Sequence, residues 1–302
     1  VQYFVEKALN QAITDYQADS GTALIMDIES GGILAMASSP SYDPNNYGDY
    51  SDNQSIFINP AISSLYEPGS IMKPIIMSSA IDSGVISADT TNTFGENITV
   101  QGYIIETAEQ KAFGKEDMTQ VLQNSDNVAM VWISQQMGIE TEYKYVKNYN
   151  FFSKTGIDLS GETAGYAPAY KLWKEVNAAT VAFGQGISVT PIEILCAYAT
   201  IANNGKYVYP HIVSKIIDSS GKETKVGKEE GKQIIKSETA KTMQTMLGNV
   251  VANGGSYRRL REAISGFTAG AKTGTAQISD VNGGYLSNDN NLGIFTHSMA
   301  GF

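Results

Sequence analysis

The stretch Tyr66-Glu67-Pro68-Gly69-Ser70-Ile71-Met72-Lys73 places a serine hydroxyl and a lysine amine three residues apart, directly after a Pro-Gly turn. If a helix starts there, Ser70 and Lys73 share one face about one turn apart, so a neutral amine can take the proton of the hydroxyl. Ser70 would also lie at the positive end of that helix, where backbone N–H groups stabilise an oxyanion. Alone, S-x-x-K is a weak pattern.

Two further motifs follow it in order. Ser125-Asp126-Asn127 lies in the middle of the chain, and Lys272-Thr273-Gly274 lies near its end. S-x-x-K, S-D-N and K-T-G in this order are the signature of penicillin-binding proteins and serine β-lactamases. A lone S-D-N is usually a loop or a helix cap, and a lone K-T-G says little more. Three ordered and well-separated motifs make coincidence improbable.

On these motifs the chain resembles the transpeptidase domain of class B, or monofunctional, penicillin-binding proteins. The resemblance runs through nearly the whole chain. Beyond the three motifs it includes Ser20-Gly21-Thr22-Ala23, Gly32-Ile33-Leu34-Ala35-Met36-Ala37, Thr155-Gly156-Ile157-Asp158-Leu159, Gly184-Gln185-Gly186 and Thr273-Gly274-Thr275-Ala276-Gln277. One departure is Ala271, where many relatives have glycine; it removes no reactive group.

Composition excludes several other classes of function. The 302 residues suffice for one large or two small cores, and a formal net charge of −10 without a basic run argues against a nucleic-acid partner. The one cysteine, Cys196, permits no disulfide within the chain. His211 and His297 stand far apart with no cluster of ligands around them. We therefore expect no metal site and no cofactor.

The start of the chain predicts an excised domain. Val1 opens a helical pattern without an N-cap, and no stretch reaches the ~18 to 20 apolar residues of a membrane span. The resemblance implies a single-pass anchor upstream of this chain, on the extracytoplasmic face of the bacterial cell membrane. It also implies a membrane glycosyltransferase as partner.

Strand patterns stand at both ends of the chain and helical patterns fill the middle. Such a chain folds most simply as α+β, with an antiparallel sheet flanked by helices and an all-helical subdomain. We expect one penicillin-binding transpeptidase domain over residues 1–302, with its sheet part at 1–45 and 205–302 and its helical part at 46–204. The motifs would then meet at the seam between the two parts.

The end of the chain predicts a missing element. The sequence stops at Phe302, midway through a strand pattern that begins at Thr296. In the resembling family another strand and a helix follow, and that strand lies between the N-terminal strand and this last one. We expect the C-terminal strand and helix to be absent here, which leaves two strands with unpaired backbone groups.

Ser70 and Lys73 are the expected nucleophile and base of an acyl-transfer site. The reference pKa of lysine is near ~10.4, and burial together with a second ammonium lowers it. Lys272 could supply that second charge. The competing interpretation of Lys73 is an exposed helix lysine, which is the usual fate of this residue type.

The S-D-N motif is expected to point polar side chains toward Lys73. Ser125 would bridge Lys73 to the leaving amine and pass a proton. Asn127 would either hydrogen-bond the substrate amide or orient Lys73. By resemblance, Asp126 supports the loop and does not react.

The K-T-G motif is expected to bind the substrate. Lys272 gives positive potential, and the hydroxyls of Thr273 and Thr275 suit a substrate carboxylate. Gly274 lets a substrate backbone lie close to the strand. By resemblance, the oxyanion hole consists of the backbone N–H groups of Ser70 and Thr275.

The resemblance implies a peptidoglycan D,D-transpeptidase. Its substrates are stem peptides ending in D-Ala-D-Ala, which it cross-links through a Ser70 acyl-enzyme that β-lactams block. Three alternatives stay open: a serine β-lactamase, a D,D-carboxypeptidase and a non-catalytic β-lactam sensor. Glu162 is the one candidate for a deacylating base, but the segment around it lacks the asparagine of class A β-lactamases and resembles a structural turn.

Overall fold

The computed structural model describes residues 1–302 except 109, 227–229, 279–284 and 288–292. The helices are α1 Gln2–Tyr16, α2 Pro60–Ser63, α3 Lys73–Ser83, α4 Met118–Asn124, α5 Asn127–Met137, α6 Ile139–Asn148, α7 Glu175–Val181, α8 Pro191–Ala202, α9 Ser237–Asn253 and α10 Arg258–Ala263. The strands are β1 Gly21–Met26, β2 Ile33–Ser39, β3 Thr91–Phe94, β4 Asn97–Val100, β5 Tyr103–Glu106, β6 Gly114–Asp117, β7 Lys215–Ile217, β8 Glu223–Lys225, β9 Ala271–Gln277 and β10 Phe295–Gly301. None of the helices in these described ranges combines the length and hydropathy needed to cross a bilayer.

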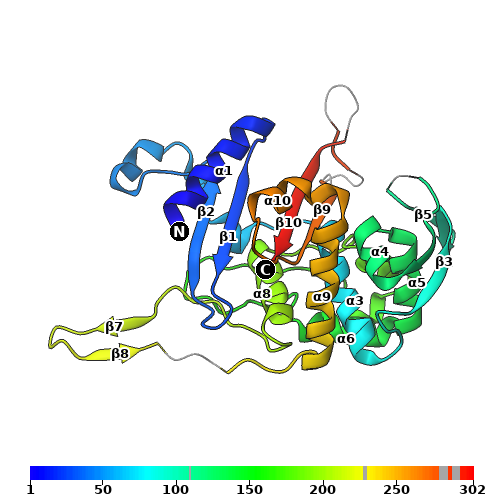
Figure 1. Cartoon of the computed structure of the whole chain (residues 1–302). Helices are drawn as coiled ribbons and strands as arrows, with labels where there is room; N and C mark the ends of the chain where they lie inside the picture. The colour runs from blue at the N-terminus through cyan, green and yellow to red at the C-terminus, as the bar shows by residue number, and fades with distance from the viewer. Residues whose placement is uncertain (109, 227–229, 279–284, 288–292) are drawn as a thin grey trace.

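The α+β class is confirmed, but the expected single sheet is corrected. β1 pairs with β2, and β9 pairs with β10 from Gln277–Phe295 to Ala271–Gly301; both pairs are antiparallel and separate. α1 packs on the first pair and α9 on β9 (Figure 1). β1 and β10 do not pair with each other, and a cavity of about 210 Å³ is lined by β1, α8 and the end of β10. The further strand expected there stays a prediction.

The core of the helical part forms around α3. Eight of the eleven residues of this helix are buried, from Lys73 to Ala80. A helix that is apolar on all sides requires neighbours on all sides, and α3 packs against α5, α6 and α9. Lys73 is therefore held in a closely packed part of the helical core.

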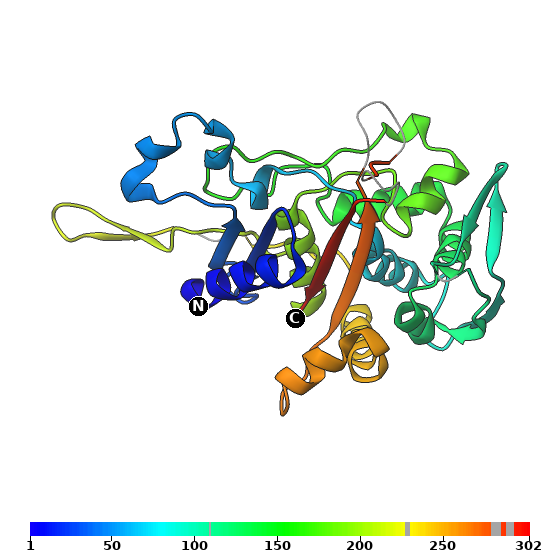
Figure 2. The same cartoon turned by 90° about the horizontal axis from the view of Figure 1, so that it is seen from above.

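The expectation of an all-helical subdomain is wrong in one respect. Strands β3 and β6 pair with each other, as do β4 and β5, within residues 91–117. These four-residue strands are too short to give the alternating pattern that identifies a strand in sequence. Figure 2 shows them at the edge of the molecule farthest from β1 and β2.

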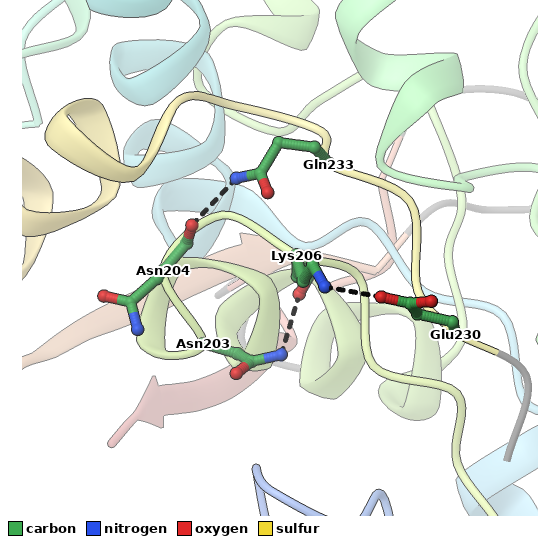
Figure 3. Close-up of polar contacts among 5 residues, drawn as sticks. All are labelled: Asn203, Asn204, Lys206, Glu230 and Gln233. Atoms are coloured by element: carbon green, nitrogen blue, oxygen red, sulfur yellow. Dashed lines mark hydrogen bonds and ion pairs between the residues drawn. The ribbon is translucent and has the colours of Figure 1, made fainter.

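The segment after the β7–β8 hairpin is tied to the end of α8. The hairpin projects from the body in both views (Figures 1 and 2), and the returning chain passes α8. There Glu230 forms an ion pair with Lys206 at 2.9 Å, and the Gln233 amide donates to the carbonyl of Asn204 at 2.9 Å (Figure 3). These contacts fix the path of the chain toward α9, which in turn supports β9.

Candidate active site

Ser70 lies on a 3₁₀ turn, Gly69–Met72, that leads directly into α3 at Lys73. The sequence predicted Ser70 on the helix itself, whereas the structure places Ser70 in the 3₁₀ turn that precedes the first residue of α3, Lys73. Gly69 has φ +58°, and a Cβ there would lie 2.9 Å from the carbonyl oxygen of Thr275. The turn can approach β9 this closely only because residue 69 is glycine.

The Gly184-Gln185-Gly186 turn supports the Ser70 turn from the other side. The Gly69 N–H donates to the Gly184 carbonyl at 2.9 Å, and the Gly186 N–H donates to the Glu67 carboxylate at 2.9 Å. Gly184 has φ +83°, and a Cβ there would lie 2.1 Å from the Gly69 oxygen. In the sequence this segment only added to the family resemblance, and its contact with the site was missed because nothing local indicates a partner so far away in the chain.

The amine of Lys73 is fully buried, and among the residues that the structure describes its hydrogen-bond partners all belong to the S-D-N motif. It makes a short hydrogen bond to the Ser125 carbonyl, a second to Ser125 Oγ at 3.1 Å and a third to Asn127 Oδ1 at 2.7 Å. Burial holds the pKa of Lys73 well below its ordinary value, and the positive charge of Lys272 lowers it further; the Asp126 and Glu116 carboxylates act in the opposite direction. The interpretation of Lys73 as an exposed helix lysine is therefore wrong.

Ser70 Oγ makes no hydrogen bond to any residue that the structure describes, Lys73 included. The direct contact expected from the three-residue spacing is thus absent in this state. Catalytic hydrogen bonds are often long in unliganded enzymes and tighten when substrate binds. The hydroxyl is partly exposed and free to turn toward either a substrate or the amine.

The S-D-N motif joins α4 to α5, as predicted. Ser125 caps α4 with φ 55° and ψ 41°, a left-handed conformation that is rare for serine. This conformation brings both its carbonyl and its hydroxyl to Lys73. Asp126 caps α5 by accepting from the N–H groups of Val128 and Ala129. The Asn127 amide also donates to the Glu106 carbonyl at 3.0 Å, so in this structure Asn127 orients Lys73.

Strand β9 carries the K-T-G motif along the Ser70 turn. Lys272 is 2% exposed, and burial lowers its pKa to about 8. Tyr257 accepts the Thr273 N–H at 2.7 Å, so this N–H points away from β10. Because alternate residues of a strand face the same edge, the Thr275 N–H shares that edge with it. This agrees with the orientation expected of an oxyanion-hole donor.

Gly274 has a packing role in addition to the expected one. A Cβ at this position would lie 2.6 Å from Ser298 Oγ and 3.0 Å from the Pro68 carbonyl. The missing side chain therefore allows β9 to lie against the turn that carries Ser70. Room for a substrate backbone, the role expected from sequence, stays a prediction.

Glu162 is satisfied by its own turn. Its Oε1 accepts from the N–H and the hydroxyl of Thr155, both at 2.6 Å, and Oε2 accepts from the Gly156 N–H at 3.2 Å. Carboxylate oxygens occupied in this way fix a loop. The interpretation of this segment as a structural turn agrees with these contacts.

Two residues of the site escaped sequence reasoning. Tyr257 lies sixteen positions before Thr273 and holds the β9 backbone. Glu116 lies in β6, 2% exposed, next to Asp126. Neither belongs to a recognisable motif, and neither could be connected to the site without knowing which elements pack together.

Comparison with known proteins identifies the family. A model of the penicillin-binding protein transpeptidase domain matches residues 21–302. Stage V sporulation protein D of Bacillus subtilis is 34% identical over 96% of this chain and 44% of its own length, and peptidoglycan D,D-transpeptidase FtsI of Escherichia coli is 30% identical over 95% and 46%. The chain thus spans less than half the length of these curated relatives. The solved structure of penicillin-binding protein 3 from Mycobacterium tuberculosis, complexed with aztreonam, superposes with a TM-score of 0.88 at 28% identity, over 99% of this chain and 67% of that one. The chain belongs to the family of penicillin-binding protein transpeptidase domains.

Proposed function

We propose that this chain is a peptidoglycan D,D-transpeptidase that cross-links stem peptides through an acyl-enzyme on Ser70. The observation that carries the proposal is the state of Lys73. Its amine is buried, lies within hydrogen-bond distance of Ser125 and Asn127, and has a pKa well below the ordinary value because of burial and Lys272. A neutral amine next to a serine is the base that acyl transfer requires.

Acylation begins when the neutral Lys73 amine takes the Ser70 proton and Ser70 Oγ attacks the penultimate D-Ala carbonyl. The backbone N–H groups of Ser70 and Thr275 stabilise the resulting oxyanion; one such donor is commonly worth roughly 10²–10³ in rate. Ser125 then relays a proton from Lys73 to the departing amine, and D-Ala leaves. The hydrogen bond from Lys73 to Ser125 Oγ supports this relay.

Deacylation reverses the roles. The amine of a second stem peptide loses a proton to Lys73 through Ser125 and attacks the acyl carbonyl, which forms the cross-link and restores the Ser70 hydroxyl. Penicillins and other β-lactams take the place of the donor peptide and leave a long-lived adduct. The contacts of Glu162 support slow hydrolysis of the acyl-enzyme, since both of its carboxylate oxygens accept hydrogen bonds from the neighbouring turn at Thr155 and Gly156.

Substrate binding falls to β9 and Asn127. The Lys272 ammonium and the hydroxyls of Thr273 and Thr275 hold the terminal carboxylate of the substrate. Gly274 leaves room for the peptide backbone, and the Asn127 side chain hydrogen-bonds to the peptide amide. In the whole protein this reaction takes place on the extracytoplasmic face of the membrane, where a single-pass anchor and a membrane glycosyltransferase partner bring the domain to nascent peptidoglycan.

Two assays test the proposal. Incubation with a fluorescent penicillin followed by peptide mapping should locate the label on Ser70, and the adduct should persist. A labelled donor peptide and an acceptor amine, followed by mass spectrometry, should yield a cross-linked product and free D-Ala. Label on another residue would refute the assignment of the nucleophile. Release of penicilloate within seconds would indicate a β-lactamase, D-Ala release without transfer a carboxypeptidase, and acylation without D-Ala release a sensor.

A further inference from the structure

A pair of buried carboxyl groups lies behind the Lys73 amine, and the steps proposed above leave it without a role. Glu116 comes from β6 and is 2% exposed, while Asp126 comes from the turn between α4 and α5 and is fully buried. The Asp126 carboxyl group lies near enough to Glu116 to raise the pKa of Glu116. The charges of both act on Lys73.

One oxygen of each carboxyl group has no donor. Asp126 Oδ1 accepts from two N–H groups of α5, and Glu116 Oε1 accepts from the Asn124 amide at 2.7 Å. Asp126 Oδ2 and Glu116 Oε2 are buried and receive no hydrogen from the residues that the structure describes. Two ionised carboxylates can only accept, and like charges side by side oppose ionisation. A single proton held between them satisfies both oxygens.

The two carboxyl groups and the two lysines of the site can carry equal and opposite charge. Lys73, Lys272, Glu116 and Asp126 are all at most 2% exposed. With both lysines protonated and both carboxyl groups ionised, the four charges cancel. Transfer of one proton from Lys73 to the carboxyl pair leaves the amine neutral, and the remaining charges of Lys272 and the pair still cancel. A neutral Lys73 is therefore reached without leaving a net charge in the interior, which would be costly.

We propose that Glu116 and Asp126 hold one proton between them when the Lys73 amine is neutral, and that this pair thereby sets the charge facing Lys73 while Ser70 is acylated. Both are positioning residues, since they act through Lys73 and do not touch the substrate. The inference rests on the proposed acylation of Ser70.

The acidity of Glu116 supports this assignment. Burial raises the pKa of Glu116 to about 7; the hydrogen bond from Asn124 opposes the shift, and the carboxyl groups of Asp126 and Asp117 add to it. The pair consequently holds its proton at pH values below about 7. As the pH rises through about 7, the pair gains a second negative charge, which stabilises the ammonium form of Lys73 and opposes its action as a base.

Glu116→Gln tests the proposal through the pH dependence of acylation. Glutamine keeps the acceptor for Asn124 and offers an N–H to Asp126, and residue 116 then carries no charge at any pH. The midpoint of the rise in acylation rate with pH should fall by up to about one unit, which makes acylation up to about tenfold faster near the wild-type midpoint. A purely structural role would lower the rate at all pH values and leave the midpoint in place.

Glu142→Gln is the matched control. Glu142 is also fully buried, its pKa is raised to about 8 by burial, and it bonds to Ser134 on the side of α5 away from the S-D-N turn. The same substitution there should leave the midpoint of acylation unchanged. A shift of equal size in Glu142→Gln would overturn the proposal, because the effect would not be specific to the pair behind Lys73.

Infrared spectroscopy detects the shared proton directly. In the Glu142→Gln protein at pH 6, adding Glu116→Gln should remove one component of the carbonyl band of protonated carboxylic acids, and this component should disappear as the pH rises through about 7. Glu67 and Glu193, whose pKa values burial also raises, contribute components that the substitution leaves in place. Absence of the component that depends on Glu116, or a Glu116→Gln profile that superimposes on wild type, would overturn the inference. If Ser70 is not acylated at all, the proposed function fails and the role in acylation fails with it, whereas this component still decides whether the pair holds the proton.

Discussion

The helical side and the strand side of the site differ in how deeply their residues are buried. On the helical side, Lys73 to Ala80 are all buried, and Lys73 is fixed by Ser125 and Asn127. On the strand side, four of the seven residues of β9 are buried, but β10, its one strand partner among the described residues, has no buried residue. In the proposed function, the packed helical side carries out the chemistry and β9 binds the substrate.

Loss of the base should have the largest effect. Lys73→Ala should lower the rate of penicillin acylation by roughly 10²–10⁴, and Lys73→Arg should fail as well because arginine does not deprotonate in proteins. Stopped-flow acylation with a fluorescent penicillin measures both. Lys147→Ala is the control, since Lys147 is a half-buried helix lysine that donates to the Phe151 carbonyl and to Ser153 Oγ, away from the motifs. Near-normal acylation by the arginine variant would mean that the base is elsewhere.

Displacing the turn that supports Ser70 should have the second-largest effect on the acylation rate. In Gly184→Ala the new methyl group would meet the Gly69 oxygen at 2.1 Å, so the Ser70 turn must move. A displacement near 1 Å costs about 10²-fold in rate. Gly161→Ala has the same left-handed strain, at φ +87°, with no atom within 4 Å. Acylation should fall in the first variant and stay normal in the second. Equal acylation rates would show that the contact between Gly184 and Gly69 does not position Ser70.

On the strand side, replacing Tyr257, the tyrosine that hydrogen-bonds to the β9 backbone, should have a smaller effect on acylation. Tyr257→Phe removes the acceptor of the Thr273 N–H and leaves that group unsatisfied, at a cost of about 1–3 kcal/mol. We expect weaker binding of donor peptide and penicillin, with little change in the maximal acylation rate. Tyr149→Phe, which breaks a buried hydrogen bond to Ser78, is the control for stability alone. A drop in maximal rate with unchanged affinity would assign Tyr257 to the chemical side.

The pH dependence of binding should be the mildest effect. Burial lowers the pKa of Lys272 to about 8, so its ammonium is present below that pH and is lost as the pH rises through it. Affinity for a substrate carboxylate should therefore fall several-fold between pH 7 and pH 9, as measured by titration with a donor peptide. Lys272→Arg should remove this decline, because its charge persists. An affinity that rises over the same range would contradict the role of Lys272.

The sequence predicted the reactive residues better than the residues that hold them in position. Ser70, Lys73, Ser125 and Lys272 stand in motifs whose spacing follows from their chemistry, and the structure brings Lys73, Ser125 and Asn127 together. Glu116, Tyr257 and Gly184 act through contacts with residues 10, 16 and 115 positions away, as shown by the effect of Asp126 on the pKa of Glu116 and by the hydrogen bonds of the other two to Thr273 and Gly69. No local pattern encodes such partners. The short strands at residues 91–117 escaped for a related reason, since four residues are too few to establish a period.

The central claim is that Lys73 is neutral at the pH where the enzyme works. Carbon-13 labelling of the lysine Cε atoms and an NMR titration between pH 5 and pH 11 tests it most directly, with Lys73→Ala and Lys272→Ala used to assign the two buried lysines. We predict that the Lys73 signal titrates well below the ordinary lysine pKa of 10.5, and that the pKa of Lys73 rises when Lys272 is removed, because the Lys272 charge lowers it. A Lys73 signal that stays protonated up to about pH 10, as expected for an exposed lysine, would contradict the account.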